Sequence, residues 1–161
     1  MRTRILVLAT VAAAVMSVQA LAGPGAAGHS HGSAEVAYGK PGDPKKPART
    51  IQITMREIDG KMVFLPSVIE VKKGEQIKLS LRNSGALDHE LVVATLEENL
   101  KHAIEMQKNP DMEHDDPNAK RLAPGKTGDI VWHFTRAGEF DFSCLIPGHR
   151  EAGMTGKIIV K

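Results

Sequence analysis

The chain has 161 residues, of which 42% are hydrophobic and 25% are charged, a composition typical of one soluble globular domain. Removing Arg2 and Arg4, which lie in a segment that we expect to be cleaved, from the 21 Lys and Arg residues leaves 19, against 19 Asp and Glu residues. The mature surface is then balanced in charge, which argues against a nucleic-acid-binding protein because such proteins carry a basic stripe.

Residues 1–22 have the pattern of a secretory signal peptide. Two arginines lie within the first four residues, an apolar run covers residues 5–16, and residues 20–22 (Ala-Leu-Ala) form a small-x-small cleavage site. The apolar run is too short to span a membrane. We therefore expect cleavage after Ala22 and a soluble product in the periplasm of a Gram-negative bacterium, with no stable membrane insertion. An uncleaved anchor is the alternative.

Residues 23–48 are rich in Gly, Pro, Ala and Lys and have few residues that can build a core. This composition predicts a flexible lead before the folded domain. His29 and His31 are its only feature with metal chemistry. Two imidazoles one residue apart can bind Cu(II) or Zn(II) loosely, although a short His pair of this kind is usually just solvated.

From residue 49 to residue 161 the pattern is that of an all-β domain. Residues 50–55 and 76–81 alternate apolar and polar side chains, and Asp59-Gly60 is a hairpin-type turn. Further strands are expected at residues 68–71, 89–95, 129–135, 139–143 and 156–160. Short strands with turn signals between them favour a Greek-key β-sandwich.

One helix interrupts this β pattern at about residues 96–108. Leu96, Leu100 and Ile104 recur with a helical period, two Glu residues follow the start, and Asn109-Pro110 ends the pattern. We therefore expect a single helix inserted into the β domain.

The inserted segment also carries His and Met residues in an acidic setting: His102, Met106, Met112 and His114. His102 and Met106 are four residues apart and share one helical face. Mixed His and Met ligands suit copper, especially Cu(I), so a second, labile copper site is one interpretation. The alternative is that Met106 packs on the sandwich, His102 is solvated and the acidic run is a polar loop.

Residues 144–154, Cys-Leu-Ile-Pro-Gly-His-Arg-Glu-Ala-Gly-Met, are the most informative stretch. Cys144, His149 and Met154 offer a thiolate, an imidazole and a thioether, with four residues in each gap. Taken singly, the Cys could be a small buried hydrophobic residue, the Met a residue that fills the core and the His an ordinary loop residue. Jointly, with a strand-like run on either side, they predict a copper site. Soft sulfur favours Cu(I), and imidazole serves both oxidation states.

This stretch resembles the C-terminal ligand loop of the cupredoxins, and its spacing is most similar to that of rusticyanin and its relatives. The resemblance extends upstream to about residue 49 and includes His89. It implies a cupredoxin-like sandwich with one type 1 (blue) copper centre. In such a centre His89, Cys144 and His149 form a trigonal plane, and Met154 is the weak axial ligand.

His89 is expected to have a hydrogen-bond partner for its second ring nitrogen. A ligating His usually donates its other ring N–H to a fixed acceptor, and the candidates nearby in sequence are Asn83, Ser84, Asp88 and Glu90. Many cupredoxins carry Asn directly after the first His ligand, whereas this chain has Glu90. Their hydrogen-bond scheme therefore does not transfer directly.

Two functions fit these observations. The first is electron transfer through one Cu(II)/Cu(I) centre, with redox proteins as partners and with the edge of His149 as the electron's exit, as the resemblance to cupredoxins implies. The second is copper sequestration or delivery in support of copper tolerance, with copper-trafficking proteins as partners. We expect a monomer. We also expect no enzymatic activity, since a nitrite-reductase-like or oxidase-like reaction needs further copper ligands in a second domain.

Overall fold

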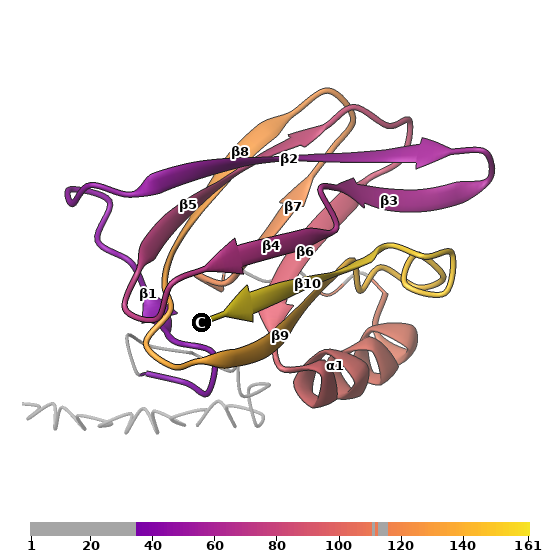
Figure 1. The fold of residues 1–161 in the computed structure, drawn as a ribbon. Helices are drawn as coiled ribbons and strands as arrows, with labels where there is room; N and C mark the ends of the chain where they lie inside the picture. Colours follow the sequence, from indigo (N-terminus) through magenta and orange to yellow (C-terminus); the bar gives the residue numbers. More distant parts are fainter. Residues whose placement is uncertain (1–34, 111, 113–115) are drawn as a thin grey trace, which may run out of the picture.

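The computed structural model describes residues 35–110, 112 and 116–161, and two five-stranded sheets pack face to face in it (Figure 1). The strands are β1 (Lys40–Pro41), β2 (Arg49–Ile58), β3 (Lys61–Leu65), β4 (Val68–Val71), β5 (Gln76–Asn83), β6 (His89–Ala94), β7 (Ala119–Leu122), β8 (Thr127–His133), β9 (Gly138–Ser143) and β10 (Thr155–Val160). One helix, α1 (Leu96–Lys108), lies between β6 and β7 in the chain. The predicted bounds of the inserted helix are confirmed.

The strand order is β1-β8-β5-β2-β3 in one sheet and β4-β10-β9-β6-β7 in the other. Most neighbouring strands are antiparallel, while β2 with β5 and β4 with β10 are parallel pairs. Chain neighbours such as β3 and β4 lie in different sheets, so the connections cross from one sheet to the other. This arrangement confirms the predicted all-β Greek-key sandwich.

The alternating pattern of the strands builds the core between the sheets. In β5, Ile77, Leu79 and Leu81 are almost fully buried while the residues between them are partly exposed. The turn between β2 and β3 is Asp59-Gly60, and both residues have positive φ, at 50° and 76°. A type I′ hairpin turn requires positive φ at both central positions, which explains the tight β2–β3 connection.

The strand β6 is buried along its whole length because both of its faces are covered. Leu91 and Val93 contribute to the core between the sheets, whereas Val92 packs with Met106 of α1 and with Leu145. The helix begins at a capping box, in which the Thr95 hydroxyl accepts a hydrogen bond from the Glu98 N–H at 3.2 Å. The inserted helix thus covers β6 and contacts β9.

The folded part of the chain begins before residue 49. β1 pairs with β8, Tyr38 is 5% exposed, and its ring stacks on Trp132 with ring centroids 5.5 Å apart. The Trp132 indole N–H also donates to the Tyr38 carbonyl at 2.9 Å. Residues 35–48, which the sequence assigns to a flexible lead, therefore pack on the sandwich. Tyr38, the β1–β8 pairing and hydrogen bonds between Asp43 and Gln76 anchor them, and average composition does not reveal such contacts.

His29, His31 and the predicted signal peptide lie outside the described residues. Among the helices that the structure describes, none combines the length and apolar character needed to cross a membrane.

Candidate metal centre

Three predicted ligands converge at one end of the sandwich. His89 opens β6, Cys144 directly follows β9, and His149 lies in the loop between β9 and β10. Their ligand atoms all lie within 4.8 Å of one another, and all three residues are buried. The Nδ1 atom of His149 is 3.3 Å from the Cys144 Sγ atom and 3.3 Å from the His89 Nδ1 atom.

This geometry fits a single metal ion. Donors bound at about 2.0–2.3 Å to one ion in a trigonal plane lie about 3.5–3.7 Å apart, so separations of 3.3 Å need only small adjustments. Two imidazoles and one thiolate are the in-plane donor set of a blue-copper site. The structure therefore brings together His89, Cys144 and His149 as a group that copper can occupy.

Met154 lies at the base of the same loop and is fully buried. Its carbonyl accepts a hydrogen bond from the Cys144 N–H at 3.1 Å, and its own N–H donates to the His149 carbonyl at 3.0 Å. The backbone of Met154 is thus tied to two of the predicted in-plane ligands, Cys144 and His149. Its assignment as the axial ligand stays a prediction.

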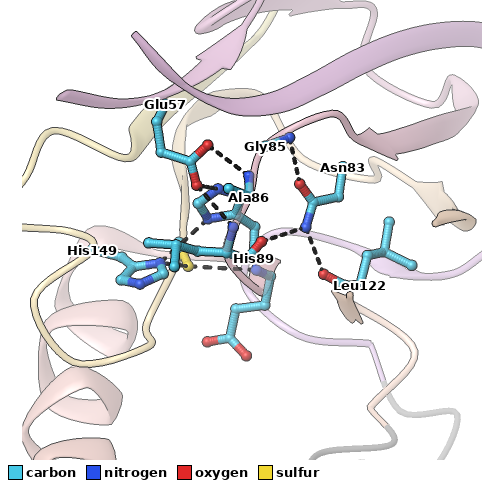
Figure 2. Close-up of polar contacts among 10 residues, drawn as sticks. Glu57, Asn83, Gly85, Ala86, His89, Leu122 and His149 are labelled. Atoms are coloured by element: carbon cyan, nitrogen blue, oxygen red, sulfur yellow. Dashed lines mark hydrogen bonds and ion pairs between the residues drawn. The ribbon is translucent and has the colours of Figure 1, made fainter. Parts of the chain in front are cut away.

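The structure identifies Glu57, on β2 in the opposite sheet, as the partner of His89 (Figure 2). The Nε2 atom of His89 is 3.0 Å from Glu57 Oε1. If Nδ1 binds the metal, Nε2 carries the proton, and its N–H donates a hydrogen bond to this carboxylate, which fixes the tautomer and the ring orientation. Glu57 is 32 residues from His89 in sequence and is therefore not among the candidates predicted from the residues next to His89.

The Glu57 carboxylate is itself held in place from the other side. The N–H groups of Ala86 and Leu87 donate to it at 3.0 and 3.1 Å. Partial desolvation acts to raise the pKa of Glu57, but these hydrogen bonds and the neighbouring His89 outweigh it and lower the pKa. Glu57 is therefore an ionised, oriented acceptor at neutral pH.

Asn83, one of the expected neighbours, and Gly85 shape the segment that precedes His89. Asn83 donates from Nδ2 to the carbonyls of Leu87 and Leu122 at 2.7 and 2.8 Å, and it accepts from the Gly85 N–H at 2.9 Å (Figure 2). A Cβ atom added to Gly85 would lie 2.3 Å from the Glu57 Oε2 atom. The absence of a side chain at this position thus makes room for the carboxylate.

Glu90 supports the cysteine ligand. Its backbone N–H donates to the Cys144 Sγ atom at 3.4 Å, and its Oε1 atom accepts from the Leu145 N–H at 2.9 Å. Burial raises the pKa of Glu90. Asp88 pairs instead with Arg121 at 3.3 Å, and the Ser84 N–H donates to the Met55 carbonyl.

Burial also controls protonation of the copper-free ligands. Desolvation raises the pKa of Cys144 to about 12 and lowers the pKa of His149, with the charge of His89 adding to the latter effect. At neutral pH the thiol is therefore protonated. Since a metal binds the thiolate, metal binding must release this proton.

The residues of the predicted second site are only partly described. Met106 is fully buried with Val92 and Leu145, and His102 is half-buried on the same helix. Met112 is 36% exposed, and His114 lies outside the described residues. The packing of Met106 matches the alternative stated above, and the second copper site stays a prediction.

The fold and the His/Cys/His group together define a cupredoxin-like copper protein. Comparison with known proteins agrees: the chain belongs to the plastocyanin/azurin family of copper-binding proteins, whose family model matches residues 51–161. It is 46% identical to the copper-resistant cuproprotein CopI of Rubrivivax gelatinosus, over 84% of this chain and 86% of that one. It is 34% identical to the protein of the same name from Pseudomonas aeruginosa, over 82% and 85% of the two chains.

Solved structures support the fold. The structure of auracyanin B superposes with a TM-score of 0.62 and 22% identity, covering 76% of this chain and 96% of that one. This similarity concerns the fold alone.

Proposed function

We propose that this copper-binding protein is exported to the periplasm and supports copper tolerance by holding copper at one cupredoxin centre. Cys144, His149, His89 and Met154 are its ligands. The observation that carries the proposal is the buried group of two imidazoles and one thiol, backed by the carboxylate of Glu57. The similarity to proteins named copper-resistant cuproproteins over most of the chain supports this role. The role is binding, not catalysis.

A growth experiment tests this role. In a strain that lacks the gene, the wild-type protein should restore growth at high copper, whereas the Cys144→Ser variant should not. Immunoblots confirm equal protein levels, and growth without added copper is the control. Because a binding protein acts stoichiometrically, tolerance should rise with the amount of protein. Equal copper tolerance with the wild-type protein and with Cys144→Ser would refute the proposal.

Export is tested on the protein itself. Amino-terminal sequencing of protein released by osmotic shock should begin at Gly23, because we place the cleavage after Ala22. Recovery of the full-length chain with the membranes would support the uncleaved anchor instead.

Electron transfer is the second candidate function. The strands β6 and β9 fix His89 and Cys144, and backbone hydrogen bonds fix the loop that carries His149, so the donors are held close together. A site that needs little rearrangement on redox suits fast electron transfer. Loss of respiratory electron flow in the deletion strain under low copper, with unchanged copper tolerance, would favour this candidate.

The number of copper ions bound per chain distinguishes a protein with one type 1 site from a protein that also has the predicted second copper site. We propose one type 1 copper. A titration of the copper-free protein should give one tight equivalent with an intense thiolate colour. Further tight equivalents that disappear in a variant with His102→Ala, Met106→Leu, Met112→Leu and His114→Ala would establish the labile second site.

A further inference from the structure

A second polar cluster lies beside the metal centre, around the carboxylate of Asp141 on β9. Three side chains donate to this carboxylate: Ser143 Oγ at 2.6 Å, Arg150 Nη1 at 3.0 Å and Asn99 Nδ2 at 2.7 Å. Arg150 also donates to the Ser143 hydroxyl. The Arg150 and Asp141 side chains are only 15% and 10% exposed, so this ion pair is largely shielded from water.

Two of the three donors are direct neighbours of predicted metal ligands in the chain, and the third lies on the inserted helix. Ser143 directly precedes Cys144, and Arg150 directly follows His149. Asn99 belongs to α1 and is fully buried. One carboxylate therefore connects the residue before the thiolate ligand, the residue after the imidazole ligand and the inserted helix.

We propose that Asp141 is a positioning residue of the metal centre, which fixes the Cys144 and His149 backbones relative to each other and links them to α1 through Asn99. This inference rests on the proposed copper site. It assigns to the helix a role in shaping the centre, although α1 supplies none of the four predicted type 1 ligands.

The energetics of the cluster favour this role. Removing one partner of a shielded ion pair strongly destabilises the fold, because the other charge stays buried and unpaired. Asn99 connects α1 to both β9 and β6, because its Nδ2 donates to Asp141 and also to the Val92 carbonyl at 3.2 Å. Its buried Oδ1 has no hydrogen-bond partner among the described residues. An unpaired acceptor destabilises the fold, so the contribution of Asn99 lies in the two bonds that it donates.

The test uses Asp141→Asn and Asn99→Ala, with two controls. Glu139→Gln lies on the same strand and removes an exposed ion pair to Lys157. Val160→Ala lowers stability from a buried position at the opposite end of the β9–β10 pair, where Val160 pairs with Gly138. Val160→Ala therefore shows how a general loss of stability, away from the Asp141 cluster, affects the labelling of Cys144.

The first readout needs no copper. The rate at which a chromogenic disulfide reagent labels Cys144 in the copper-free protein measures opening of the ligand loop. Asp141→Asn should label about tenfold faster than Val160→Ala at equal thermal stability, and Asn99→Ala should change in the same direction. Glu139→Gln should label like the wild type. If Asp141→Asn fails to fold, Asn99→Ala carries the test.

The second readout is the loaded centre. Asp141→Asn and Asn99→Ala should change the copper hyperfine splitting of the Cu(II) EPR spectrum and speed copper loss to a chelator by about tenfold. Unchanged labelling and spectra, even with lowered thermal stability, would overturn the inference and leave Asp141 a purely structural residue. A wild-type protein that binds no copper would overturn the proposed function instead, and the labelling result would stand apart from it.

Discussion

Replacing Glu57 by Gln removes one negative charge from the acceptor of His89 while keeping a similar shape. With its amide oxygen in place of Oε1, Gln can still accept from the Leu87 N–H (now 3.1 Å) and from His89 Nε2, whereas an amide NH2 in place of Oε2 cannot accept from the Ala86 N–H (now 3.0 Å). Apart from this one lost loop hydrogen bond, the fold should be preserved. What changes is the charge-assisted hydrogen bond at His89 Nε2, now 3.0 Å long, which strengthens the imidazole as a metal donor.

The expected size follows from the position of the carboxylate. Removing the partner of a ligating His typically lowers metal affinity by about 10- to 100-fold. The Glu57 side chain is 28% exposed, so solvent screens part of its charge and the lower value, about tenfold or 1.4 kcal/mol, applies. Because a negative charge stabilises Cu(II) more than Cu(I), the reduction potential should rise by up to about 59 mV for a tenfold difference.

The assay is a pair of competition titrations, one for Cu(II) and one for Cu(I), together with a potentiometric titration of the same samples. Glu70→Gln, which removes the same charge from an exposed pair with Lys161, is the matched control. Gly85→Ala should shift the affinity in the same direction as Glu57→Gln, since its added Cβ displaces the carboxylate. A Glu57→Gln protein with wild-type affinities and potential would refute the role assigned to this carboxylate.

Three further predictions concern the ligands themselves. Cys144→Ser should abolish the intense visible colour on Cu(II) addition, and retained colour would contradict the thiolate assignment. Met154→Leu should keep copper bound but change the potential, because the axial bond is weak; complete loss of binding would contradict the axial assignment. Since the pKa of Cys144 is raised to about 12, copper binding should release about one thiol proton, and affinity should rise about tenfold per pH unit between pH 7 and 9. A pH-independent affinity over that range, measured in a buffer that does not bind copper, would contradict this protonation state.

Features that depend on residues close together in the chain, such as the inserted helix and the loop that carries Cys144, were predictable from the sequence. The bounds of α1 follow from a helical period and from the Asn109-Pro110 end signal directly after it, and the joint spacing of Cys144, His149 and Met154 identifies one loop. Such signals are short-range, because each is read from neighbours in the chain. The expected strands overlap the observed ones, but the strand expected at residues 129–135 lies two residues earlier, at Thr127–His133.

What the sequence did not reveal depends on contacts between distant segments. Glu57 reaches His89 only because β2 and β6, in opposite sheets, bring their ends together at the metal centre. The strand β7 was missed because Ala119–Leu122 has one buried apolar residue and no alternation. Tyr38 is anchored by Trp132, 94 residues away. Single contacts of this kind leave no periodic trace in the chain.

The two carboxylates at the centre bear directly on its function. Glu57 supports His89 and favours the more highly charged Cu(II), whereas the buried sulfur of Cys144 favours Cu(I). This combination suits copper in both oxidation states, as the proposed role in copper tolerance requires. Glu90 acts differently, because it holds the Leu145 N–H and so fixes the backbone beside the thiolate. Glu90→Gln should therefore leave the ratio of Cu(I) to Cu(II) affinity closer to wild type than Glu57→Gln does. If the two variants shift that ratio equally, charge near the centre, and not the hydrogen bond to His89, sets the preference.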